Sequence, residues 1–402
     1  MKICVYGLPQ SGKDTFIRKL TSLGFEHLPG SRTLKTLALQ EYQSEFSNLS
    51  ENQKTLLRQK FITILQSMDV EKRIVVDGHY CFGNHIVFFP EEGIAYDVFI
   101  YLNTPPSVIH ERLQKSERNI QYASFSERQL EEWQRLEIRQ LSKICFDNRR
   151  EFIVLDSSTE DSLLFLEHFF LKYPSLSSLV KAQEIADNIK KNCGNNKKIA
   201  IFDCDKTVSS HDITVSVFEV ANISVKFLKQ LFYNEPYTQF QFWKLHRLYD
   251  NLDQYEKVLK DAVVQVDFND FILAKMDELR NNGYKIFGLT SGITDAWKII
   301  NSRYRLFSDV YGGILSSAIK GYVVQILMES GFSVFACGDS TVDIFMLESA
   351  SIGVIWAPGK IRETIQAYFN ENPRTTIVQF RDNPNQYLGI KSIERSEYVV
   401  PS

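Results

Sequence analysis

The chain lacks several features that would place it outside the cell or in a membrane. It has no apolar run long enough to span a bilayer, and its start has no charged region followed by an apolar segment. Its cysteines form no CxxC pair, which argues against a structural zinc site and indicates reduced, buried thiols. The six cysteines are Cys4, Cys81, Cys145, Cys193, Cys204 and Cys337. These absences predict a cytoplasmic protein that binds no membrane.

Neither sign of charge dominates the sequence. The 46 Lys and Arg residues are nearly balanced by 49 Asp and Glu residues, and the formal net charge is −3. No basic stripe interleaved with aromatic residues is present, so the electrostatic footprint of a nucleic-acid-binding surface is weak. At 402 residues the chain is long enough for two domains with separate cores.

Short β-branched runs alternate with amphipathic stretches along the whole chain. This alternation predicts an α/β fold with parallel sheets. The expected strands of the first half are 2–6, 25–28, 73–76, 96–102 and 152–155, and those of the second half are 198–202, 284–289, 332–337, 351–356 and 375–379. A polar segment at 190–197, after a predicted helix at 178–191, reads as the linker between two domains.

The first expected strand runs directly into a phosphate-binding loop. Residues 7–15 read GLPQSGKDT, which matches G-x-x-x-x-G-K between a strand and a helix. Gly7 and Gly12 permit the backbone path, the backbone N–H groups face an anion, and Lys13 reaches the β and γ phosphates. The residue after the lysine is Asp14 instead of Ser or Thr, with Thr15 next. Asp14 could hold Mg²⁺ through oxygen, but it also adds negative charge beside a triphosphate.

Residues 1–173 resemble the nucleoside-monophosphate kinases, which bind ATP. The resemblance is carried by the phosphate loop, GSRTLK at 30–35, IVVDGHY at 74–80, and the strand and helix over 96–112. It implies that Asp77 organises Mg²⁺, that Arg118 is a lid arginine and that Arg112 also contacts phosphate. Guanidinium groups bind phosphate bidentately, which favours a functional role for Arg118; the alternative for both arginines is a solvated helix charge.

The central strand 198–202 ends in the sequence DCDKT, with Asp203 and Asp205 on one side of the chain. Asp203 can attack phosphorus as a nucleophile, and Asp205 can protonate the leaving oxygen and later activate water. Two carboxylates repel a phosphate dianion, so a lysine and Mg²⁺ must come from elsewhere in the chain. The candidates are Ser291 as a hydroxyl donor (with Thr290 as a substitute), Lys320 as the cation, and Asp339 and Asp343 as metal ligands.

These four motifs, in this order, resemble the haloacid-dehalogenase-like phosphatases, particularly the phosphoserine-phosphatase type. The resemblance implies a phosphoaspartyl intermediate and a metal site that includes Asp203, Asp205, Asp339 and Asp343. It predicts a domain over 198–402 with a helical cap at about 208–284, after a helical connector at 174–197. The expected architecture is therefore two Rossmann-like three-layer αβα domains. The predicted cap is rich in aromatics, which could stack on a nucleobase or form the core of a small helical bundle.

The two motif sets together predict a bifunctional enzyme that uses ATP and Mg²⁺. One half would be a kinase for a nucleotide or small metabolite, and the other would hydrolyse a small, nucleotide-like phosphomonoester. Phage polynucleotide kinase–phosphatase has the same domain order, which makes nucleic-acid end processing an alternative. Polynucleotide kinases resemble one another in having an acidic and Arg pair, led by Asp, shortly after the phosphate loop. This chain lacks that pair, so the alternative is less favoured. A third possibility is that one domain only senses a nucleotide and regulates the other. The oligomeric state is not indicated.

Overall fold

The computed structural model describes residues 1–83, 85–117, 120–156, 160–232, 237–358, 361–371, 375–376, 379–380 and 391–392. The chain divides into two compact units, Met1–Leu171 and Lys172–Ser402. Among the described residues, no helix combines the length and the apolar character needed to cross a membrane.

The first unit is built on a five-stranded parallel sheet with the phosphate-loop strand at its centre. The strand order is β2-β3-β1-β6-β7. The bounds are β1 Lys2–Tyr6, β2 Glu26–Leu28, β3 Ile74–Asp77, β6 Val98–Leu102 and β7 Glu151–Leu155. In β1 every residue after Lys2 is buried, as expected for a strand covered on both faces. A short antiparallel pair, β4 Cys81–Phe82 with β5 His85–Ile86, follows β3.

Seven α-helices accompany this sheet in the described residues. They are α1 Lys13–Ser22, α2 Gly30–Tyr42, α3 Glu51–Ser67, α4 Glu92–Ala95, α5 Pro106–Gln114, α6 Glu127–Asp147 and α7 Glu160–Lys172. Local sequence explains where two of them begin, because Ser50 before α3 and Ser126 before α6 each form a capping box with the Gln three residues later. The long α6 buries one face, including Leu130 and Ile138, against the sheet side of the unit.

The second unit has a six-stranded parallel sheet in the order β10-β9-β8-β11-β12-β14. Its strands are β8 Lys198–Phe202, β9 Lys285–Leu289, β10 Asp309–Tyr311, β11 Ser333–Gly338, β12 Ile352–Trp356 and β14 Gln379–Phe380. Of the motif-bearing strands, β8 lies between β9 and β11. Since parallel strands end at the same sheet edge, the residues after them are brought together. A separate antiparallel pair joins β13 Thr375–Thr376 and β15 Lys391–Ser392.

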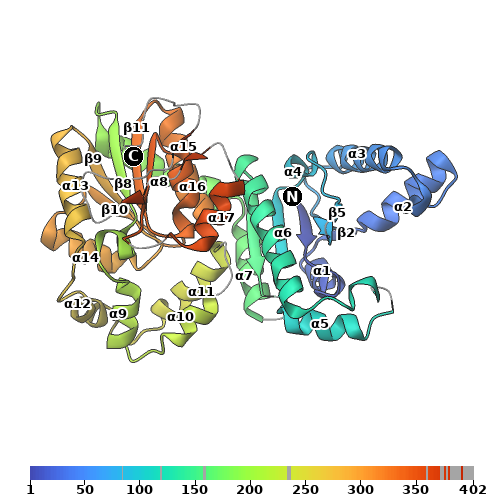
Figure 1. Ribbon diagram of the computed structural model, residues 1–402, viewed down its shortest axis with the longest axis horizontal. Coiled ribbons are helices and arrows are strands. Elements are labelled where there is room, and N and C mark those ends of the chain that lie inside the picture. Colours follow the sequence, from blue (N-terminus) through green and yellow to red (C-terminus); the bar gives the residue numbers. More distant parts are fainter. Residues whose placement is uncertain are drawn as a thin grey trace. The chain divides into compact units, whose positions relative to one another are not determined.

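Helices cover both faces of this second sheet (Figure 1). On one side lie α13 Asp270–Asn281 and α14 Thr294–Tyr304, and on the other lie α8 Ser178–Cys193, α15 Ser317–Glu329 and α16 Ile344–Ser349. The helix α17 Glu363–Glu371 follows β12. The expected three-layer αβα architecture is thus confirmed in both units.

Four further helices gather beside one end of the second sheet (Figure 1): α9 Ile213–Val220, α10 Lys226–Leu231, α11 Gln239–Asp250 and α12 Tyr255–Ala262. They lie within the range predicted for the cap. That range also contained α13, which instead packs against β9 in the sheet layer. The residues predicted as a connector contain the whole of α8, which packs on α15 within the second unit.

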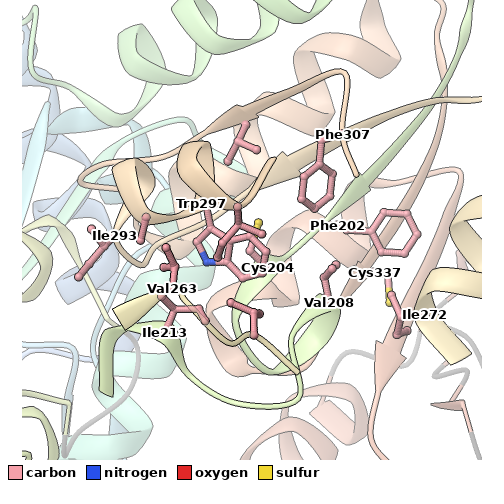
Figure 2. Packing of buried hydrophobic residues seen from close by; sticks show 14 of the residues in the cluster. Phe202, Cys204, Val208, Ile213, Val263, Ile272, Ile293, Trp297, Phe307 and Cys337 are labelled. Atoms are coloured by element: carbon pink, nitrogen blue, oxygen red, sulfur yellow. The ribbon is translucent and has the colours of Figure 1, made fainter. Parts of the chain in front are cut away.

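The helices of the cap share a core with the sheet (Figure 2). Ile213 and Val263 from this region belong to the same buried cluster as Phe202, Trp297 and Phe307. All five side chains are nearly inaccessible to solvent. Burying side chains of this size stabilises a fold by about 1.5–3 kcal/mol each, so the cap is anchored firmly at its base.

Candidate functional sites

The phosphate loop has the backbone path that its glycines predict. Gly7 has φ 145° and Gly12 has φ 97°, in the region that favours glycine, and α1 begins directly after Gly12. A Cβ at Gly7 would lie 2.8 Å from Ser11 Oγ. The Ser11 carbonyl accepts a hydrogen bond of 2.7 Å from Thr104 Oγ1 after β6, which ties the loop to the neighbouring strand end.

Lys13 folds back over this loop. Its ammonium donates to the carbonyl oxygen of Gly7 and, at 3.2 Å, to that of Leu8. Burial lowers the pKa of Lys13 to about 8, partly offset by the charges of Glu137 and Asp77. In the same loop, Ser11 Oγ is buried and has no hydrogen-bond partner among the described residues. A positive side chain and an unpaired hydroxyl beside a helix N-terminus suit a polyphosphate.

Of the other residues expected to bind phosphate, Arg112 lies beside the loop. From α5 its Nη1 donates to the carbonyl oxygen of Gln10 at 3.0 Å, and it is 3.6 Å from the position that a Cβ on Gly12 would take. Asp14 and Thr15 are exposed on the first turn of α1, and Thr15 Oγ1 accepts a hydrogen bond from Arg18. Arg118 lies outside the described residues.

Asp77 is the last residue of β3 and lies beside the loop, as the sequence predicted. Its carboxylate contacts the start of α2. Asp77 Oδ1 accepts a hydrogen bond of 2.9 Å from the Gly30 backbone N–H and lies 3.3 Å from His27 Nε2. No group of three or more metal-ligating side chains includes Asp77 among the residues that the structure describes. The observed contacts of Asp77 are therefore those of a residue that positions a helix.

The second unit brings its motif residues together at the end of the sheet. Lys320 Nζ lies 2.7 Å from Asp203 Oδ1 and 2.8 Å from Asp343 Oδ1, and all three side chains are buried. Burial by itself would lower the pKa of Lys320, but the two carboxylates outweigh it and raise that pKa. The pKa of Asp203 is raised by burial and by Asp343, against the opposing effect of Lys320.

Three carboxylates from two strand ends could hold one metal ion. Ligand oxygens of Asp203, Asp339 and Asp343 lie within 4.8 Å of one another. The three carboxylates carry three negative charges when ionised, and Lys320 supplies one positive charge. Hard oxygen ligands with an excess of negative charge fit Mg²⁺. The carboxylate of Asp205, also expected at the metal, is not in this group.

The carboxylate of Asp205 instead accepts hydrogen bonds from three donors. Its Oδ1 accepts from the Ile213 N–H at 2.8 Å, and its Oδ2 accepts from Thr290 Oγ1 and Trp297 Nε1, both at 3.1 Å. Burial, together with Asp212, raises the pKa of Asp205 to about 7, while the three donors act against that rise. A carboxyl group that titrates near neutrality can both give and accept a proton.

Ser291 and Asp339 complete the rim of the site. Ser291 Oγ donates a hydrogen bond to the Leu315 carbonyl at 2.7 Å. The hydroxyl of Thr290, which was the alternative to Ser291 as hydroxyl donor, donates to Asp205. Burial and Asp343 raise the pKa of Asp339 to about 7, although Arg362 opposes this at 3.8 Å. Of these two candidate hydroxyl donors, Ser291 lines the cavity and Thr290 does not.

Several of these groups border one cavity of about 210 Å³. Asp203, Asp205, Ser291, Lys320 and Asp339 line its polar part. The remaining wall comes from cap residues and from Lys206, Asp212, Gly292, Ser340, Val342 and Arg362. Lys206 pairs with Asp212 at 2.9 Å.

Sequence reasoning missed three residues of this site. Trp297 and Arg362 carry no motif signal, because their roles depend on packing between segments far apart in the chain. Lys206 stands inside the DCDKT motif, so its position could have been noted.

Each unit therefore holds one candidate site. The first unit contains a phosphate loop, and the second brings together the residues that carry the resemblance to haloacid-dehalogenase-like phosphatases.

Comparison with protein families gives one match, which lies in the first half of the chain. Residues 6–154 match the family model described as an AAA domain. No curated protein matches the chain.

Each of the similar solved structures covers less than half of the chain. A phospho-aspartyl intermediate analogue of phosphoserine phosphatase has 17% identity and a TM-score of 0.35, covering 43% of this chain and 91% of its own. A phosphoserine phosphohydrolase-like protein from Francisella tularensis has 16% identity and a TM-score of 0.36 over 42% and 92%. Shikimate kinase from Bacteroides thetaiotaomicron has 15% identity and a TM-score of 0.30 over 43% and 99%. At such values nothing about activity follows from these likenesses.

Proposed function

We propose that the chain is a bifunctional enzyme, an ATP-dependent kinase joined to a Mg²⁺-dependent phosphomonoester hydrolase. The observation that carries the hydrolase is the buried Asp203–Lys320–Asp343 contact at the floor of a cavity that also contains Asp205. An ion pair that only stabilises the fold does not require a further carboxyl group of raised pKa, such as Asp205, beside it. A phosphoaspartyl mechanism requires such a group.

In this proposal the Asp203 carboxylate attacks phosphorus, and the ester P–O bond breaks as the new P–O bond forms. Asp205 gives its proton to the leaving alkoxide oxygen. Asp205 then takes a proton from water as the water oxygen attacks the phosphoaspartate, which releases phosphate and restores Asp203. Lys320 and Ser291 bind the oxygens of the transferred phosphoryl group.

Asp203, Asp339 and Asp343 would hold the metal ion, since their oxygens form the one suitable group among the described residues. When bound, Mg²⁺ supplies positive charge that offsets repulsion between these carboxylates and the phosphate.

The kinase half of the proposal rests on the phosphate loop. Lys13 would exchange its contacts with the carbonyl oxygens of Gly7 and Leu8 for phosphate oxygens of ATP, and Arg112 stands close enough to join it. Phosphoryl transfer depends mainly on positioning and charge, which these groups supply. The acceptor is proposed to be a nucleotide or another small metabolite.

The experiment is a paired screen of the full chain. Phosphate release is measured over a panel of phosphomonoesters with Mg²⁺ or with EDTA, and transfer from labelled ATP is measured over mononucleotides, small hydroxyl metabolites and oligonucleotides. We expect Mg²⁺-dependent phosphate release that Asp203→Asn abolishes, and transfer to a small acceptor.

Each half of the proposal can fail separately. Phosphate release that survives Asp203→Asn would overturn the hydrolase. Transfer confined to oligonucleotide ends would favour nucleic-acid end processing, and ATP binding without transfer would make the first unit a nucleotide sensor.

A further inference from the structure

The cavity of the second unit has two chemically different walls. Its floor is polar and contains Asp203, Lys320 and Ser291, whereas five side chains of the cap form an apolar wall. These five side chains, called here the apolar wall, are Leu228, Phe232, Tyr237, Phe242 and Leu245. Because both walls border one cavity, a phosphoryl group on the floor would direct the rest of its ester towards the apolar wall.

The aromatic members of the apolar wall hold each other in place. The ring of Phe232 lies 5.4 Å from that of Phe242 and 4.9 Å from that of Tyr237. The Tyr237 hydroxyl donates to the Phe232 carbonyl at 2.9 Å, so its polar atom is satisfied by backbone. Ring distances of this size are those of favourable aromatic pairs. The wall is thus a preorganised surface.

Part of this wall is left accessible. Phe242 and Leu245 are 3% exposed, whereas Leu228, Phe232 and Tyr237 are only partly buried. A purely structural cluster would bury these side chains against the cap core. Here they retain surface on the cavity side, where an apolar group can displace water.

The charged groups of the cavity argue against a zwitterionic leaving group. In the described lining, Thr214 and the apolar wall contribute no charged side chain, and the acid at the start of the cap that lines the cavity is Asp212. Asp212 already pairs with Lys206 at 2.9 Å. An ammonium group held against the apolar wall would therefore lose water without gaining an unpaired counter-ion from the wall, which is costly.

We infer that the hydrolase acts on phosphomonoesters whose alcohol carries a bulky apolar or aromatic group, which packs on the apolar wall, and discriminates against esters with an ammonium at that position. This inference rests on the proposed hydrolase function. The small cavity suits a metabolite-sized ester, because pockets for larger ligands usually exceed about 300 Å³.

The substrate preference is tested with three esters: ethyl phosphate, 2-phenylethyl phosphate and O-phosphoethanolamine. All three have a primary alkoxide as the leaving group. For the full chain with Mg²⁺ we expect kcat/KM for 2-phenylethyl phosphate to exceed that for ethyl phosphate by about tenfold or more, since one apolar group in a fitted pocket is worth 10–200-fold. O-phosphoethanolamine should fall below ethyl phosphate. Similar leaving groups keep the chemical step comparable.

Variants then assign the selectivity to the wall. Phe232→Ser should reduce the phenylethyl-to-ethyl ratio towards one, and Phe232→Leu should keep most of it. Val220→Ser, on the exposed side of α9, is the matched control and should not alter the ratio. Equal kcat/KM values for the three esters in the native chain would overturn the inference while leaving the hydrolase intact. No Asp203-dependent hydrolysis of any of the three esters, or of p-nitrophenyl phosphate, would overturn both.

Discussion

Lys320 Nζ lies 2.7 Å from Asp203 Oδ1, although 117 residues separate them in the chain. The side chain of Lys320 is 1% exposed and that of Asp203 9%. Two buried carboxylates, Asp203 and Asp343, share this one cation at hydrogen-bonding distance. The proposed catalytic arrangement is therefore also a buried ion network, and we expect it to contribute to folding as well as to chemistry.

Replacing Lys320 tests that dual role. Lys320→Met leaves two buried carboxylates without their cation, and removing one partner of a buried pair costs about 3–5 kcal/mol. We expect the free energy of unfolding, measured by urea denaturation, to fall by this order, and added Mg²⁺ to restore part of the loss. Lys260→Met is the control, because Lys260 is 68% exposed and pairs loosely with Glu256. Equal stability of the two variants would contradict the prediction.

The two sites should respond separately to substitution. Asp203→Asn removes the nucleophile and should lower phosphate release by about a thousandfold or more, while ATP-dependent transfer is kept. Lys13→Ala should do the reverse, because it removes the charge that binds the β and γ phosphates. Both activities are measured on each full-length variant. Loss of both in either variant would show that the sites depend on one another.

ATP binding should take up protons above neutral pH. Burial lowers the pKa of Lys13 to about 8, so at pH 8.5 most of the free protein carries a neutral lysine. Bound polyphosphate favours the charged form and raises this pKa, so binding takes up a proton and the affinity falls as the pH rises above about 8.

Titration calorimetry at pH 8.5, in two buffers of different ionisation enthalpy, measures this uptake. Lys13→Arg is the matched variant, because a guanidinium stays charged at this pH and should bind ATP without the uptake. Identical heats in the two buffers for the native chain would refute the assignment.

Arg112 should contribute to transfer through its position beside the loop. It contacts the Gln10 carbonyl at 3.0 Å, and a hydrogen bond to a charged group is worth about 1.5–3 kcal/mol. We expect Arg112→Ala to lower kcat/KM for ATP about tenfold or more. Arg112→Lys should recover only part of the lost kcat/KM, because an ammonium group cannot bind phosphate through two parallel hydrogen bonds as a guanidinium does. Arg128→Ala removes an exposed arginine on α6 and should have no effect; if both alanine variants behave alike, Arg112 has no special role.

The sequence predicted the strands that carry chemistry. β1 and β8 have the predicted bounds, because a run of apolar residues followed by a Gly-rich or Asp-rich turn is a strong signal in an α/β fold. β10 was missed, since its three residues Asp309–Tyr311 are too few to show a pattern. The range given to the cap included α13, because helical periodicity does not reveal which layer a helix joins.

The sequence predicted the site residues that belong to motifs. It did not predict the residues that reach the site only through tertiary packing. Asp203, Lys320 and Asp343 are identifiable from the order of the motifs. The Trp297–Asp205 hydrogen bond joins residues 92 apart, and the apolar wall arises from helices whose aromatic residues fit a structural core equally well. Such contacts follow from tertiary structure, which a single sequence does not reveal.

All six native thiols are buried, and burial raises the pKa of each. Thiolates are the species that react with maleimides, so the native cysteines should be slow to label. A fluorescent probe can therefore be attached to one engineered surface cysteine in each half without first removing the natural ones. Energy transfer between two such dyes would report whether the distance between the halves changes during turnover.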